Sequence, residues 1–234
     1  MKKSTPDFAK FEASAGITFR NKELLRRAFT HRSFLNENRG SESSHNERLE
    51  FLGDAVLELM VTEYLFEKYP DSNEGDLTAY RASLVNAITL SEVAQKINVN
   101  DFLLLSKGEA RDTGKARQYI LANTMEAIIG AIYLDQGYDA AKYFISKNLF
   151  HLIDRIVQEK TWIDAKSLFQ EKAQEKESLT PQYKSLKEEG PDHDKKFTVG
   201  VYLDKELVAE GDGMSKQEAE QVAARKALEA KKWL

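Results

Sequence analysis

The sequence predicts two domains, an all-helical domain followed by a small α+β domain. From about Phe19 to Val157, apolar residues recur at intervals of three and four, the spacing of one helix face. The pattern then changes, because three short strand-like stretches follow between two helical ones. With 234 residues, of which 41% are hydrophobic, the chain is long enough to fill two such cores.

Four amphipathic stretches make up the predicted helical domain, and polar, turn-rich segments separate them. The helical stretches cover residues 21–35, 47–69, 77–97 and 119–137, and the breaks cover 36–46, 69–76 and 106–118. The predicted small domain runs in the order α-β-β-β-α, with a helix at 164–176, strands at 181–189, 196–204 and 206–213, and a helix at 215–233. We predict domains at 1–157 and 163–234, joined by a charged linker at 158–162.

Composition excludes several classes of protein. No segment approaches the roughly 20 apolar residues of a membrane span, so we expect no membrane partner and a cytoplasmic location. The absence of cysteine excludes disulfides and thiolate metal sites, and the four histidines lack the close helical spacing of a zinc site. The net charge of -4, taken alone, argues against nucleic acid, since phosphate-binding proteins usually carry a basic surplus.

Three carboxylates lie in the predicted helix 47–69, at Glu47, Glu50 and Asp54. Their offsets of i, i+3 and i+7 place them on one face. Both sides of this helix are otherwise apolar, which predicts that it is buried. Burying like charges costs several kcal/mol each unless a cation or hydrogen bonds compensate, and no lysine or arginine shares the face. A solvated acidic face, the usual explanation of this spacing, is therefore disfavoured.

The predicted helix 119–137 has the same character, because the polar pair Asn123 and Glu126 lies among apolar residues. We expect the two helices to meet in the core and their acids to form a cluster. Oxygen ligands without His or Cys favour Mg²⁺, with Mn²⁺ as a substitute, over zinc. Such sites serve phosphoryl chemistry. A buried, hydrogen-bonded structural network stays open as the alternative.

These segments resemble a known family. "HNERLEFLGDAVL" at 45–57 closely resembles the signature of the ribonuclease III endonuclease domain, and "ILANTMEAIIGAIYLDQGY" at 120–138 resembles its second signature helix. "FTHRSFLNEN" at 29–38 and "YPDSNEGDLTAYRASLVN" at 69–86 resemble other family segments in the expected order. The resemblance covers nearly the whole chain, and its first motif is highly specific.

The resemblance implies a homodimeric, divalent-metal-dependent endonuclease that cleaves double-stranded RNA, as in rRNA-precursor and mRNA processing, and leaves a 5′ phosphate and a 3′ hydroxyl. It implies that Asp54 and Glu126 are catalytic. It also implies the following roles: Glu50, Asp54, Asn123 and Glu126 as metal ligands, Glu47 as a supporting residue, Glu74 as a supporting residue that approaches from near the dimer interface, and Phe51 as an aromatic that packs into the partner subunit.

Asn123 departs from the family pattern, which has aspartate three residues before the glutamate. Asparagine keeps a carbonyl oxygen that can ligate a metal, but it removes one negative charge and cannot act as a base. Two functions therefore stay open: an active nuclease that tolerates Asn123, and a catalytically impaired double-stranded RNA-binding protein of the same fold. A third, a helical scaffold that uses its acids only for stability, would bind neither Mg²⁺ nor RNA.

The predicted small domain resembles a double-stranded RNA-binding domain. Ser215 and Glu218 form an S-x-x-E capping box, which leaves helix amides and Lys216 available for a phosphate. The family usually has a second lysine where this chain has Gln217. The resemblance implies an RNA-binding set of Gln170, Glu171, Pro191, His193, Ser215, Lys216 and Gln217. From Trp162 to Leu234 there are 13 Lys and Arg against 15 Asp and Glu, so binding must use a local face and be sensitive to salt.

Overall fold

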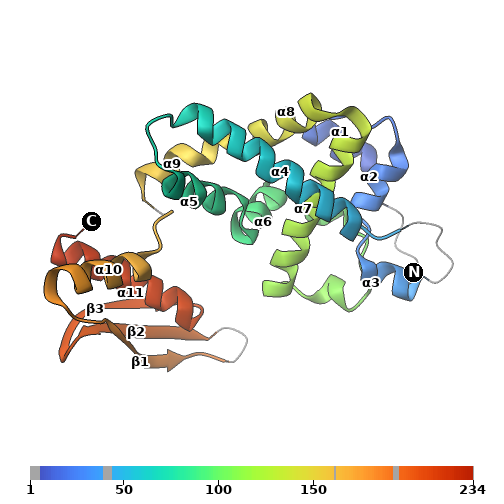
Figure 1. The fold of residues 1–234 in the computed structure, drawn as a ribbon. Coiled ribbons are helices and arrows are strands. Elements are labelled where there is room, and N and C mark those ends of the chain that lie inside the picture. Colours follow the sequence, from blue (N-terminus) through green and yellow to red (C-terminus); the bar gives the residue numbers. More distant parts are fainter. Residues whose placement is uncertain (1–5, 39–43, 161, 192–194, 234) are drawn as a thin grey trace. The chain divides into compact units, whose positions relative to one another are not determined.

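The computed structural model describes residues 6–38, 44–160, 162–191 and 195–233, and it divides into two compact units. The first unit, Met1–Trp162, is helical throughout its described part, and the second, Ile163–Leu234, combines helices with a sheet (Figure 1). The predicted fold class, an all-helical domain followed by a small α-β-β-β-α domain, is confirmed. No helix in the described part of the chain is both long and apolar enough to cross a membrane.

The helical unit is built around two long helices, α4 and α7. Its elements are α1 (Phe8–Ala15), α2 (Lys22–Ala28), α3 (Arg32–Glu37), α4 (Glu47–Lys68), α5 (Glu74–Val85), α6 (Ala87–Lys96), η1 (Val99–Phe102), η2 (Glu109–Arg111), α7 (Lys115–Gln136), α8 (Tyr138–Asn148), η3 (Phe150–Leu152) and α9 (Ile153–Gln158). Of these, α7 is the most enclosed, with an unbroken run of buried residues from Ala127 to Ile132.

Two helices predicted as continuous are each split in the structure. The stretch 21–35 is interrupted at Thr30, which pairs with Leu104 in an isolated parallel bridge, and α3 then begins after His31. The stretch 77–97 is interrupted at Asn86, whose side chain accepts a hydrogen bond from the Thr89 backbone N–H at 2.9 Å and so starts α6. In both places capping or pairing groups compete with the helical hydrogen bonds and outweigh the apolar periodicity.

The backbones of α4 and α7 touch where glycines face each other. A Cβ added at Gly53 would lie 1.8 Å from the Glu126 carbonyl oxygen, and one added at Gly130 would lie 2.3 Å from the Leu49 carbonyl oxygen. No real side chain tolerates such distances. The two helices therefore cross in direct backbone contact, which fixes both their separation and their register.

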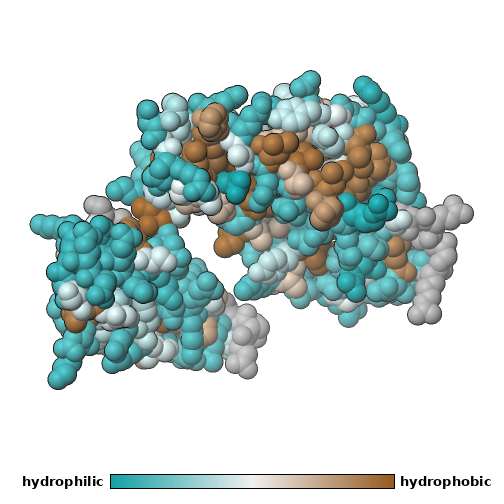
Figure 2. Space-filling model, viewed as in Figure 1, coloured by the Kyte–Doolittle hydropathy of each residue, from teal (hydrophilic) through white to brown (hydrophobic). Residues whose placement is uncertain are grey.

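The outer face of α4 is apolar and exposed, which corrects the expectation that this helix is buried on all sides. Phe51 is 81% exposed, Leu59 59% and Phe66 72%. Hydrophobic surface accordingly follows the course of α4 in Figure 2. The apolar periodicity was real, but within this single chain only the inner face of α4 is covered.

The small unit packs two helices against one face of a three-stranded antiparallel sheet (Figure 1). Its elements are α10 (Ala165–Glu177), β1 (Gln182–Glu189), β2 (Lys196–Leu203), β3 (Glu206–Gly213) and α11 (Lys216–Lys231), with the strands in the order β1-β2-β3. Phe169 of α10, Val201 and Leu203 of β2 and Leu228 of α11 lie in a core separate from that of the helical unit.

Glycine also sets the close approach of β3 and α11. A Cβ at Gly211 would lie 2.2 Å from the Ala223 backbone nitrogen, and one at Gly213 would lie 2.6 Å from the Ala219 nitrogen. Small residues on the facing side of the helix complete the contact. The start of α11 is thus held firmly against the end of β3.

We expect Gly130→Ala to destabilise the helical unit by about 2 kcal/mol or more, because the added methyl forces α4 and α7 apart. Gly108→Ala is the control, since its Cβ would meet only the Ser106 hydroxyl oxygen at 3.8 Å. Calorimetric unfolding of the two variants measures the difference. Equal unfolding temperatures would show that the glycine contact does not set the helix separation.

Candidate active site

The helix crossing brings together polar side chains from two distant parts of the sequence. On α4, Glu50 lies about one turn before Gly53 and Asp54 directly follows it, and Asn123 and Glu126 lie on α7 at the same crossing. The charges of Asp54 and Glu50 act on Glu126, and the side chain of Asn123 hydrogen-bonds Glu50. The structure therefore joins all four predicted metal ligands in one place.

Glu126 is the acid most altered by its surroundings. Burial, followed by the negative charges of Asp54 and Glu50, raises the pKa of Glu126 to about 8. No basic side chain in the described part of the chain contributes to this shift. Glu126 is therefore half-buried among other acids and has no basic neighbour among the described residues. The protein alone does not stabilise the ionised form of this carboxyl.

Glu50 has a less extreme environment, and Asn123 is the reason. Burial, the charge of Glu47 and the charge of Asp54 raise the pKa of Glu50, while the hydrogen bond from Asn123 opposes that rise. An amide N–H donates to a carboxylate, which an ionised aspartate at the same position could not do. Asn123 therefore adds a donor to the cluster in place of one more negative charge.

Glu47 lies at the edge of the cluster and has its own basic partners. Its carboxylate is 3.5 Å from the Arg32 guanidinium and 3.7 Å from His45 Nδ1, and its side chain is about half exposed. No arginine shares the helix face of Glu47 in the sequence, because Arg32 belongs to a different helix, α3. Only the tertiary fold brings this cation to the site.

Glu74 lies away from the other acids in this chain. It is the first residue of α5, exposed, and it contributes to the pKa shift of neither Glu50 nor Glu126. The intervening α4 extends 18 residues from Glu50 to Lys68, which corresponds to about 27 Å of helix. The structure thus does not join Glu74 to the cluster of its own chain.

The donor atoms of the cluster fit a hard divalent cation. They are carboxylate oxygens and one amide oxygen, which Mg²⁺ and Mn²⁺ prefer and zinc does not. In the described part of the chain, no three His, Asp or Glu side chains already converge closely enough to hold an ion. Small rotations of these side chains would therefore be needed to surround a cation.

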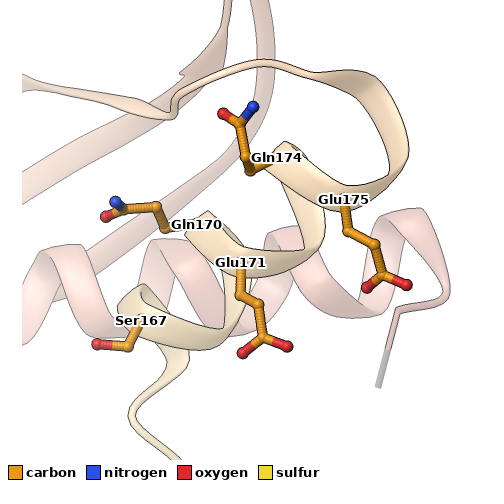
Figure 3. A pocket seen from close by; sticks show the side chains of 5 residues that line it. All are labelled: Ser167, Gln170, Glu171, Gln174 and Glu175. Atoms are coloured by element: carbon orange, nitrogen blue, oxygen red, sulfur yellow. The ribbon is translucent and has the colours of Figure 1, made fainter.

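Five of the seven predicted RNA-binding residues of the small unit fall on two surfaces. Gln170 and Glu171 are exposed on α10 and line a shallow hollow together with Ser167, Gln174 and Glu175. In Figure 3, Gln170 and Gln174 point to one side of the helix, and Glu171 and Glu175 point to another. The amide side offers donors and acceptors suited to sugar hydroxyls.

The second surface surrounds the start of α11. Ser215 Oγ accepts a hydrogen bond from the Glu218 N–H at 3.2 Å, and the Glu218 carboxylate accepts one from the Met214 N–H at 2.8 Å. The predicted capping box is thus confirmed at Ser215, while its reciprocal bond falls one residue earlier than Ser215. Lys216 and Gln217 follow in the first turn, both exposed.

The remaining RNA-binding predictions concern the turn after β1. Pro191 is exposed there, and His193 lies outside the described residues. A further residue, not predicted from the sequence, is Glu188 near the end of β1, whose carboxylate contacts Lys216 and Lys195. No periodicity signals such a contact, because it depends on how β1 is paired with β2.

Comparisons with known proteins agree with both units. A family model described as Ribonuclease-III-like matches residues 21–153, and one described as Double-stranded RNA binding motif matches residues 165–231. The chain is 46% identical over 221 residues to Ribonuclease 3 of Bdellovibrio bacteriovorus, covering 94% of each chain. It is 48% identical over 213 residues to Ribonuclease 3 of Pelotomaculum thermopropionicum, covering 91% of this chain and 88% of the relative.

A solved structure extends the comparison to three dimensions. The nuclease domain of ribonuclease III from Campylobacter jejuni matches with a TM-score of 0.55 and 45% identity, covering 61% of this chain and 98% of that one. The long shared span with the curated relatives and the two matching domain models point to one conclusion. The chain belongs to the ribonuclease III family of endoribonucleases, with a double-stranded RNA-binding domain after its nuclease domain.

Proposed function

We propose that this protein is a divalent-metal-dependent endonuclease that cleaves double-stranded RNA, including structured rRNA and mRNA precursors, and leaves 5′ phosphate and 3′ hydroxyl ends. The observation that carries the proposal is the cluster of Glu50, Asp54, Asn123 and Glu126 at the helix crossing, which holds acids without a matching basic group. Family membership and the double-stranded RNA-binding domain support the substrate class.

The four residues of the cluster would hold Mg²⁺ or Mn²⁺ through their oxygens. When bound, such a cation lowers the pKa of coordinated water and stabilises charge on a phosphate. Without a cation, the Glu126 carboxyl retains its proton through neutral pH, because its pKa is raised to about 8. Binding of the cation must therefore release this proton, so metal affinity should increase with pH.

The protein's own residues also explain why RNA needs a cation here. Glu50 and Asp54 would repel the phosphates of a duplex, while Asn123 orients Glu50 through its hydrogen bond. Arg32 balances Glu47 at the edge and leaves the centre of the cluster acidic. The small domain supplies duplex binding through its exposed amides and lysines.

We propose that two chains pair through the exposed face of α4. Phe51, Leu59 and Phe66 form an exposed apolar stripe along α4, and contiguous exposed apolar surface marks sites of protein–protein contact. A two-fold axis across this stripe would run the two α4 helices in opposite directions. The start of α5 in one chain would then approach the acidic cluster of the other, which would give Glu74 a role that it cannot have within its own chain.

Asn123 favours one competing function, a protein that binds duplex RNA without cutting it. The direct test is incubation of a long RNA duplex with the unaltered chain in Mg²⁺, in Mn²⁺ and in EDTA. Fragments with 5′ phosphates in either metal, and none in EDTA, are expected. Duplex binding without fragments in any condition would instead establish the competing function.

Glu126→Gln should reduce cleavage by about 100-fold or more, because it removes a charged oxygen donor from the centre of the cluster while leaving the small domain intact. Duplex binding in EDTA should stay unchanged. Glu92→Gln, which alters an exposed acid on α6, is the matched control and should cleave normally. Normal cleavage by Glu126→Gln would rule out its proposed role.

Asn123→Asp should act in opposite directions on stability and metal binding. It replaces a hydrogen-bond donor with another negative charge, so the metal-free protein should unfold more easily at neutral pH. The same charge should tighten Mn²⁺ binding, measured by titration calorimetry, by about tenfold. Unchanged Mn²⁺ affinity would indicate that residue 123 does not contact the cation.

Mixing two inactive variants tests the role of Glu74 across the dimer. A mixed dimer of Glu74→Gln and Glu126→Gln contains one fully intact site if Glu74 acts on the partner's cluster. It contains none if Glu74 acts on its own. We expect co-refolded mixtures to recover nicking of one RNA strand, seen on denaturing gels, whereas each variant alone does not. Failure to recover nicking, with mixed dimers verified by differential tags, would contradict the shared site.

A further inference from the structure

The end of the small sheet places one acid beside the lysines at the start of α11. Glu188 of β1 pairs with Phe197 of β2, and Phe197 pairs with Gly213 of β3, so these three residues form one row across the sheet. α11 begins three residues after Gly213, at Lys216. Since Gly213 is packed tightly against α11, the row fixes where the Lys216 side chain emerges.

Glu188 contacts two lysines at this point. Lys216 Nζ lies 2.7 Å from Glu188 Oε1, and Lys195 Nζ lies 3.3 Å from Glu188 Oε2. Both ammonium groups also lie over the Phe197 ring, at 5.7 Å and 5.9 Å from its centroid. The two lysines lower the pKa of Glu188 through hydrogen bonds and charge, which keeps its carboxylate ionised at neutral pH.

The position of this carboxylate matters because Lys216 stands where the proposed function requires a phosphate contact. A carboxylate and a phosphate recognise the same ammonium donors. The first turn of α11 also has only one basic residue next to its cap, since the residue after Lys216 is Gln217. A carboxylate that is paired with Lys216 in the free protein must therefore share this lysine with the RNA phosphate or lose the contact when a duplex binds.

We propose that Glu188 competes with the RNA phosphate for Lys216 and Lys195, and so sets the affinity of the small domain for double-stranded RNA. The proposal rests on duplex binding by this domain. Glu188 acts as a tethered counterion that the RNA backbone displaces, and after displacement its charge remains close to the incoming phosphates. Because the pair is largely exposed, its contribution to folding is small and exchange is easy.

The opposite role is also physically reasonable and makes a contrary prediction. If Glu188 served to hold Lys216 in the orientation that phosphate needs, its removal would weaken RNA binding. Competition requires that removal strengthen it. The sign of the change in affinity therefore decides between the two.

Glu188→Gln and Glu189→Gln form a matched pair for the test. Both remove one negative charge from the same strand end, but the Glu189 carboxylate contacts Lys187 at 2.7 Å, while the Glu188 carboxylate contacts the two lysines at the start of α11. Binding of the full chain to an RNA duplex of about 20 base pairs, longer than the roughly 16 that such domains span, is measured by fluorescence anisotropy in EDTA.

We expect Glu188→Gln to bind the duplex about threefold to tenfold more tightly than the unaltered chain, and Glu189→Gln to change affinity by less than about twofold. The gain should shrink as salt is added, and it should be reduced in a Lys216→Gln background, where part of the competition has no target. Binding to a DNA duplex of the same sequence measures how much of the affinity is nonspecific attraction to a phosphate backbone.

Several results would overturn the proposal. Equal affinities for the two variants would mean that only net charge matters, and weaker binding by Glu188→Gln would mean that the residue positions Lys216. If Glu188→Gln increases the affinity for RNA just as much in the Lys216→Gln background, Glu188 does not act through Lys216. If the unaltered chain fails to bind the RNA duplex, the proposed RNA-binding function itself fails, which is distinct from a failure confined to Glu188.

Discussion

The backbone contact between α4 and α7 is the constraint on which the rest of the helical unit depends. Gly53 and Gly130 let two helices approach more closely than any side chain allows, so residues on either side are brought into contact by the backbone itself. Glu50 and Asp54 face Asn123 and Glu126 as a direct consequence. The helix α7 is enclosed by α4 together with α2, α6 and α8, while α4 keeps an outer face that its own chain leaves uncovered.

This arrangement concentrates negative charge and supplies compensation only at its edge. Arg32 and His45 stand beside Glu47, whereas Glu126 at the centre has acids as its charged neighbours and a pKa raised to about 8. A site built only for stability would place its cation where burial is greatest. Here the basic groups lie at the edge and the most buried acid of the cluster, within the described part of the chain, has none. This distribution suits a site whose central negative charge is neutralised by a cation that binds after folding.

The sequence predicts the acids well and their surroundings less well, for physical reasons. Helical periodicity and apolar context alone singled out Glu50, Asp54 and Glu126, because one helix face is a local property. The break inside the helix predicted at 77–97 depends instead on a side-chain cap at Asn86. The apolar residues on the outer face of α4 predict burial, although that face is exposed in this chain, since periodicity cannot distinguish a surface covered by the same chain from one left open. The contact of Glu188 depends on strand register, which shifts at an irregularity between Ser185 and Lys187.

Net charge was a poor guide to RNA binding because it ignores how charges are paired. In the small unit Lys166 contacts Glu220, Lys231 contacts Glu177, and Lys216 shares Glu188 with Lys195. A lysine already paired with a carboxylate attracts phosphate less than an unpaired one, so the number of lysines overstates the attraction. It also follows that affinity can be changed without adding or moving any lysine, since an acid placed beside a phosphate-binding cation alters its availability. In a domain with more acids than bases, the position of each acid relative to the lysines determines the local attraction for an anion more than the sum of charges does.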